Sequence, residues 1–94
     1  MTAMTARPTS PLRVFLADDH PLVLEGIKSF LFADDGLALV GEARDGLTAL
    51  RLAVELEPDV AILDLSMPGL NGIEVAGRLL DACPQCRVVN PDRA

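Results

Sequence analysis

Three aspartates stand where short apolar segments of the sequence end. Asp18 and Asp19 follow the apolar segment 14–17, and Asp64 follows the apolar segment 60–63. Carboxylates held close together at neutral pH repel one another, so they need either raised pKa values or a divalent cation. A cluster made of oxygen ligands suits Mg²⁺ best. If the three side chains meet in the fold, they predict a magnesium site.

A purely structural role for the same residues is the alternative. An aspartate after a strand often caps the next helix, as Asp19 would for a helix beginning at Pro21 and as Asp45 would further along the chain. Asp64 is different, because a Pro-Gly loop follows it and no helix begins there for it to cap. The metal interpretation is therefore favoured for the set.

The elements that position these aspartates alternate between strand and helix. Apolar runs typical of buried strands are followed each time by helical spacing of apolar residues. Because such an alternation implies right-handed crossovers and a parallel sheet, the carboxyl ends of all strands lie at one edge, where Asp18, Asp19 and Asp64 meet. The expected elements are strands from Arg13, at Leu37–Ala43, at Val60–Leu63 and from Arg87, with helices beginning near Pro21, Gly46 and Asn71.

Each expected helix carries an apolar stripe and a start signal. Pro21 suits a first helical position, and Asn71 with Glu74 forms a capping box for the third helix. The stripes predicted to face inward are Leu22, Val23, Gly26, Ile27, Phe30 and Leu31 in the first helix, Leu47, Leu50, Ala53 and Val54 in the second, and Ile73, Val75, Ala76, Leu79 and Leu80 in the third.

Length and charge limit the class of protein. The chain has 94 residues, half of them apolar, and a net charge of -6, which is typical of one small domain. A single lysine, Lys28, speaks against direct binding of nucleic acid. Residues 1–12 are interpreted as a loose leader without a secretory signal, and residues 13–94 as one domain. No apolar run approaches the roughly 20 residues of a membrane span, so a cytoplasmic location is expected.

Two cysteines invite a redox or zinc interpretation. Cys83 and Cys86 are spaced as Cys-Pro-Gln-Cys. A redox pair of this spacing opens a helix after a strand, whereas this pair follows a helical pattern and precedes a strand. Zinc would need two more ligands nearby. A plain helix-to-strand connection is the favoured interpretation.

Taken in order, the acidic pair, the strand-end aspartate and the loop after it resemble a bacterial two-component response-regulator receiver domain of the CheY-like superfamily. The resemblance runs without a gap from Arg13 to Val89. Within the family, the sequence is most similar to the receivers of LuxR-type regulators. The segments that carry it are Asp18–Gly26, Val40–Gly46, Pro58–Val60 and Asp64–Glu74.

The resemblance implies a function for each aspartate. It implies a flavodoxin-like, doubly wound parallel sheet in which a sensor histidine kinase donates a phosphoryl group to Asp64. Mg²⁺ would be held by Asp18, Asp19, Asp64 and the backbone carbonyl of Ser66. Such a domain is a phosphoprotein and a regulated acceptor in a phosphorelay, not a turnover enzyme. His20 is a kinase-facing or metal-side candidate, although a role as a helix-entry residue is favoured.

The sequence also departs from the family pattern. A receiver continues through a hydroxyl residue at the end of the fourth strand, a fifth strand ending in lysine and a fifth helix, and these are not found in this sequence. The alternative function is therefore a truncated receiver that does not switch and acts only as a protein-interaction fragment. The fourth strand would then be an exposed edge through which the chain self-associates. An acid phosphatase is a distant third, because Ser66 stands where that class needs a second aspartate.

Overall fold

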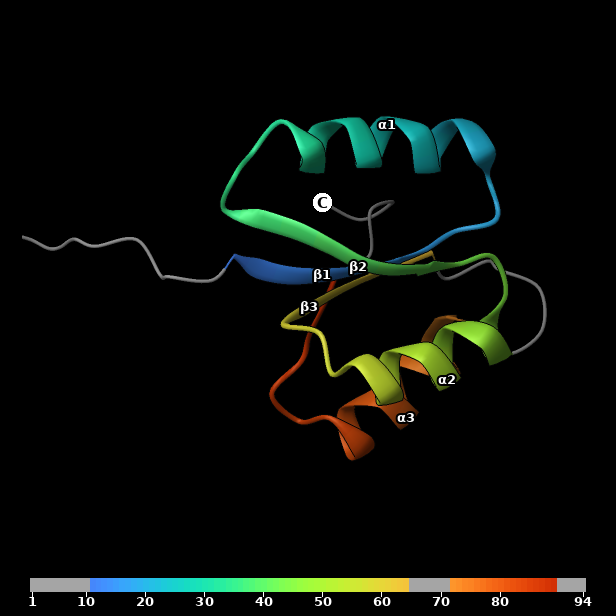
Figure 1. Ribbon diagram of the computed structural model, residues 1–94. Helices are drawn as coiled ribbons and strands as arrows, with labels where there is room; N and C mark the ends of the chain where they lie inside the picture. Colours follow the sequence, from blue (N-terminus) through green and yellow to red (C-terminus); the bar gives the residue numbers. More distant parts are fainter. Residues whose placement is uncertain (1–10, 65–71, 90–94) are drawn as a thin grey trace, which may run out of the picture.

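The computed structural model describes residues 11–64 and 72–89, in which parallel strands alternate with helices. The elements are β1 (Leu12–Ala17), α1 (Pro21–Phe32), β2 (Leu37–Ala43), α2 (Gly46–Leu56), β3 (Val60–Leu63), α3 (Gly72–Ala82) and β4 (Arg87–Val89). The strand order is β2-β1-β3-β4, and each neighbouring pair is parallel. In Figure 1, α1 covers one face of the sheet, and α2 and α3 cover the other. The predicted α/β fold with a parallel sheet and flanking helices is confirmed.

The central strand β1 is buried on both faces. Phe15 and Ala17 belong to the core cluster on the α2 and α3 side, and Val14 and Leu16, which alternate with them, are buried as well. Successive side chains of a strand point to opposite faces, so this strand fills both layers. That is why its sequence is continuously apolar instead of alternating with polar residues. The buried members of the cluster are Phe15, Ala17, Ala43, Ala49, Ala53, Ala61, Leu63, Val75, Leu79, Cys83 and Cys86.

In each helix, only part of the predicted apolar stripe is buried. The buried hydrophobic residues are Leu24 and Leu31 in α1, Ala49 and Ala53 in α2, and Val75 and Leu79 in α3. The predicted stripe residues that are instead exposed are Leu22, Val23, Gly26, Phe30, Leu47, Val54, Ile73 and Leu80. The expectation that these side chains face inward is wrong. Helical spacing gives the direction of a stripe, whereas the sheet and the neighbouring helix determine which part of it they contact.

A bulge and a glycine bring β2 close to its neighbours. The register shifts between Val14 paired with Leu39 and Phe15 paired with Gly41, so β2 contains one extra residue there. A Cβ atom at Gly41 would lie 2.7 Å from Leu56 Cδ1, which is too close for a real contact. A larger residue at position 41 would therefore force the Leu56 side chain, and to a lesser degree the Phe15 ring at 3.3 Å, to move.

Asp45 caps α2, as the sequence predicted. Its Oδ1 accepts a hydrogen bond from the Thr48 N–H at 2.8 Å, and its Oδ2 accepts one from the Thr48 hydroxyl at 2.9 Å. These bonds satisfy a backbone donor that the helix itself leaves without an acceptor. They also lower the pKa of Asp45, with the backbone bond from Thr48 as the larger cause.

Removing this cap is expected to destabilise the chain in a pH-dependent way. At pH 7, Asp45→Ala should unfold at a lower temperature than the native chain, because the Thr48 N–H loses its acceptor. A lowered pKa means that the stabilisation is present above the ordinary value near 3.8 and is lost as the pH falls through the folded-state pKa. Thermal melts between pH 2 and 7 should therefore converge at low pH. Asp45→Asn, which keeps an acceptor oxygen, is the control and should lose less; a pH-independent difference would contradict the expectation.

The two cysteines are buried free thiols in the connection between α3 and β4. The Cys86 N–H donates to the Cys83 carbonyl at 3.0 Å, closing the turn between the two elements. Burial, and next the neighbouring Cys83, raise the pKa of Cys86 to about 11. A thiol with so high a pKa is a poor nucleophile at neutral pH. The geometry favours the plain helix-to-strand connection over a redox centre.

No helix within residues 11–64 and 72–89 has the length and apolarity needed to cross a membrane. Even α1 has only 12 residues, against the roughly 20 that a bilayer requires.

Candidate functional site

The backbone brings Asp18 and Asp64 together. β1 and β3 are adjacent and parallel, with Ala17 paired to Leu63, so the residues that follow these two positions lie side by side. The Asp64 N–H donates to the Ala17 carbonyl at 2.9 Å, and the Asp18 N–H donates to the Ala43 carbonyl at 3.1 Å. Both aspartates are thus held by continuations of the sheet ladder.

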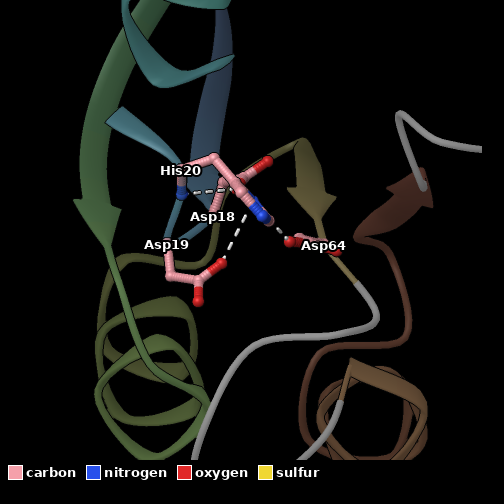
Figure 2. A network of polar contacts seen from close by, with 4 residues as sticks. All are labelled: Asp18, Asp19, His20 and Asp64. Carbon is pink, nitrogen blue, oxygen red and sulfur yellow. Dashed lines mark hydrogen bonds and ion pairs between the residues drawn. The ribbon is translucent and has the colours of Figure 1, made fainter. Parts of the chain in front are cut away.

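Four side chains gather at this edge of the sheet. Figure 2 shows Asp18, Asp19 and His20, which follow β1, turned toward Asp64, which follows β3. One potential ligand atom from each of the four residues lies within 4.8 Å of all the others. Asp18 and Asp64 are almost completely buried, while the side chain of Asp19 is 34% exposed. The expectation that the three aspartates meet is confirmed; their roles as ligands and as phosphoacceptor stay predictions.

His20 belongs to this cluster, which the sequence reasoning did not favour. Its Nδ1 lies 2.7 Å from Asp18 Oδ1, 3.1 Å from Asp19 Oδ1 and 3.3 Å from Asp64 Oδ2. Although His20 occupies the N-cap position of α1, its side chain makes no capping hydrogen bond. His20 is therefore the helix-entry residue that was expected, but the modest capping expected of its side chain is not found. The signal that pointed to the site was its position directly after the acidic pair.

The carboxylates change the acid–base behaviour of His20. The hydrogen bond to Asp18 raises the pKa of the imidazole most, and the negative charge of Asp19 raises it further. The Asp18 Oδ1 atom also accepts the His20 backbone N–H at 2.9 Å. The acidic charge of the cluster is thus partly compensated by a neighbouring side chain.

The oxygen donors fit a divalent cation. Within the described part of the chain, Asp19 Oδ1 is shielded from solvent and accepts no hydrogen bond, and its near neighbour is the ion-paired His20 Nδ1 at 3.1 Å. A buried oxygen of this kind is costly unless a donor or a cation satisfies it. The same observation argues against Asp19 as a cap of α1. Carboxylate oxygens from three residues are the donor set that Mg²⁺ prefers.

Part of the predicted site lies outside the described residues. Ser66, the predicted source of a backbone carbonyl ligand, falls in the segment 65–71, as does Asn71 of the predicted capping box. Both assignments stay predictions. Within residues 11–64 and 72–89, the arrangement can hold a cation against the Asp64 carboxylate at the carboxyl ends of the strands. In open α/β sheets this is the edge at which ligands bind.

Known response regulators are similar to this chain in sequence. Response regulator GacA of Pseudomonas viridiflava is 45% identical over 78 residues, which are 83% of this chain and 36% of that protein. The nitrate/nitrite response regulator protein NarL of Escherichia coli K12 is 38% identical over 79 residues, 84% of this chain and 37% of NarL. The chain therefore spans little more than a third of the length of these relatives.

A solved structure agrees with the sequence relatives. The signal receiver domain of the putative response regulator NarL from Mycobacterium tuberculosis superposes with a TM-score of 0.81 at 41% identity, covering 86% of this chain and 65% of that one. Residues 14–90 match the family described as the response regulator receiver domain, a segment that contains the whole aspartate cluster. The chain belongs to the response regulator receiver domain family.

Proposed function

We propose that the chain accepts a phosphoryl group on Asp64 from a sensor histidine kinase, as the receiving step of a cytoplasmic phosphorelay. The observation that carries the proposal is the meeting of Asp18, Asp19 and Asp64 at the carboxyl edge of the sheet. Membership in the receiver family supports it. The proposed role is that of a regulated acceptor, not of a turnover enzyme.

The residues have distinct roles in this proposal. A carboxylate oxygen of Asp64 attacks the phosphorus of a phosphohistidine, the phosphorus–nitrogen bond breaks, and the imidazole leaves with the electron pair of that bond and takes up a proton. The product is an acyl phosphate on Asp64. The burial of Asp64 and its backbone hydrogen bond to Ala17 restrict the positions that its side chain can take, which supports a positioned nucleophile.

Asp18 and Asp19 would hold Mg²⁺ together with Asp64 and the backbone carbonyl of Ser66. When bound, this ion neutralises the charge that gathers on the transferring phosphoryl oxygens. Asp18 is held by its hydrogen bonds, whereas the side chain of Asp19 is 34% exposed to solvent. The donor phosphate would approach the cluster from the side of Asp19.

Acetyl phosphate tests acceptance without a kinase. Incubated with this small acyl phosphate and Mg²⁺, the chain is expected to gain the mass of one phosphoryl group while acetate leaves. Hydroxylamine should remove the group, because it cleaves acyl phosphates and spares phosphoserine. An unlabelled chain, or a label that resists hydroxylamine, would refute phosphorylation of a carboxylate.

We also propose that copies of the chain associate through the outer edge of β4. Among the described strands, β4 pairs only with β3, and its Val89 is 42% exposed. An unpaired strand edge presents backbone donors and acceptors to a partner strand. Sedimentation equilibrium should show an average mass that rises with concentration, whereas a monomer at every concentration would exclude this association.

A further inference from the structure

His20 has a position that helix capping does not explain. It is the N-cap residue of α1, where a polar side chain ordinarily turns toward the first free N–H groups of the helix. Its side chain instead turns back toward the carboxylates, and Figure 2 shows the imidazole nitrogen between Asp18, Asp19 and Asp64. Its orientation is therefore determined by the cluster.

The distances from this nitrogen resemble those within one metal coordination shell. His20 Nδ1 lies 2.7, 3.1 and 3.3 Å from one oxygen each of Asp18, Asp19 and Asp64. Neighbouring ligands on a small divalent ion with bonds of about 2.1 Å are separated by about 3 Å in octahedral geometry. A single ion can thus contact all four residues after a small outward adjustment of the side chains.

An imidazole nitrogen changes which ions such a site prefers. Mg²⁺ favours oxygen ligands, whereas imidazole suits Ni²⁺ and Zn²⁺, and the affinity of a given site rises from Mn²⁺ through Co²⁺ to Ni²⁺. A metal ion that binds here displaces the proton that Nδ1 shares with Asp18 and releases it to solvent. The neutral histidine then carries its proton on Nε2 and presents a lone pair at Nδ1. One nitrogen and three carboxylates form a mixed donor set suited to these transition-metal ions.

We propose that His20 Nδ1 is a ligand that makes the aspartate cluster a site for divalent transition metals, which bind there more tightly than Mg²⁺. The proposal rests on the proposed function only in using the same three aspartates, and it does not require phosphoryl transfer. His20 favours transition-metal ions over Mg²⁺, whereas the carboxylates can bind either kind of ion.

Nickel and magnesium titrations of two chains test the proposal. A tag-free chain is suitable because His20 is its single histidine. By calorimetry, His20→Gln should weaken Ni²⁺ binding roughly tenfold or more and change Mg²⁺ binding by less than about twofold. Cys86→Ala is the matched control, since its buried thiol should contribute nothing to nickel binding. A melt without metal checks that His20→Gln is folded, which is expected because no capping bond is lost.

Pulsed EPR of bound Mn²⁺ gives a readout that a structural role would not change. The native chain should show coupling to an imidazole nitrogen, and His20→Gln should show none. Unchanged Ni²⁺ affinity, or absence of nitrogen coupling in the native chain, would overturn the proposal. A rise in Mg²⁺ affinity on replacing His20 would also overturn it, because the imidazole would then be a competitor of the ion. If acetyl phosphate does not label Asp64 while nickel binding depends on His20, only the proposed function fails.

Discussion

Asp64→Asn is expected to abolish labelling by acetyl phosphate. The amide has nearly the shape of the carboxylate but lacks its nucleophilic oxygen, so no acyl phosphate forms. Asp64 is fully buried, and the Asp64 N–H hydrogen bond to the Ala17 carbonyl does not depend on the side chain. The fold should therefore persist, and intact mass spectrometry after incubation with Mg²⁺ should find the unmodified chain alone.

A matched control separates this effect from a general loss of acidic residues. Asp35 is an exposed aspartate before the start of β2, at the edge of the sheet opposite to the cluster, and Asp35→Asn should label like the native chain. Circular dichroism should show the same helix content for both variants. A hydroxylamine-sensitive adduct that persists in Asp64→Asn would assign the acceptor to another carboxylate.

The second large effect concerns the metal. Replacing both Asp18 and Asp19 with asparagine is expected to remove detectable Mg²⁺ binding, because two of the three carboxylates in the cluster are lost. Asp64 alone would bind the ion only weakly. Calorimetric titration of the double variant with Mg²⁺ measures this loss directly, and Asp35→Asn again serves as the control. Unchanged affinity would show that the pair has only a structural role.

The same double variant should be more stable than the native chain in metal-free buffer. Each pair among the three carboxylates is repulsive, and the substitutions remove all three repulsions. They also remove the attractions of His20 for Asp18 and Asp19. The substitutions thus remove more repulsive pairs than attractive pairs. An asparagine at position 18 can still accept the hydrogen bond from the His20 backbone N–H. A lower melting temperature in the double variant would mean that the attraction of His20 for Asp18 and Asp19 outweighs the repulsion among the three carboxylates.

These two sets of variants address different parts of the proposed mechanism. Asp64→Asn removes the nucleophile and leaves Asp18 and Asp19, so some metal binding should remain. The double variant leaves the nucleophile and removes most of the metal site, so its labelling should fall for want of the ion. Measuring both binding and labelling in both variants separates metal binding from phosphoryl acceptance.

Much of the sheet could be predicted from local sequence. The bounds of β2 and β3 match the expected segments Leu37–Ala43 and Val60–Leu63, because apolar runs this short between turn residues are typical of strands and too short for most helices. Asp45 was expected to cap a helix and does so, since capping depends on residues only three apart. The meeting of Asp18 with Asp64 followed from the rule that alternating strands and helices form a parallel sheet.

Other features depended on contacts between distant segments. Leu22 and Phe30 lie in the apolar stripe of α1 yet are 87% and 78% exposed, whereas Leu24 is buried. The sequence spacing gives a stripe, but the position of the sheet beneath the helix determines which residues are covered.

The sequence alone determined that this protein is a parallel α/β domain with three aspartates at one edge of the sheet. The order of its short apolar runs and turns can be read locally, and that order predicts a parallel sheet. Tertiary structure alone determined that His20 turns from the start of α1 toward Asp64, a residue 44 positions away on another strand. The direction of a side chain at a helix start depends on the charges that surround it in space. Asp64 joins Asp18 and Asp19 beside His20 only after β1 and β3 have paired.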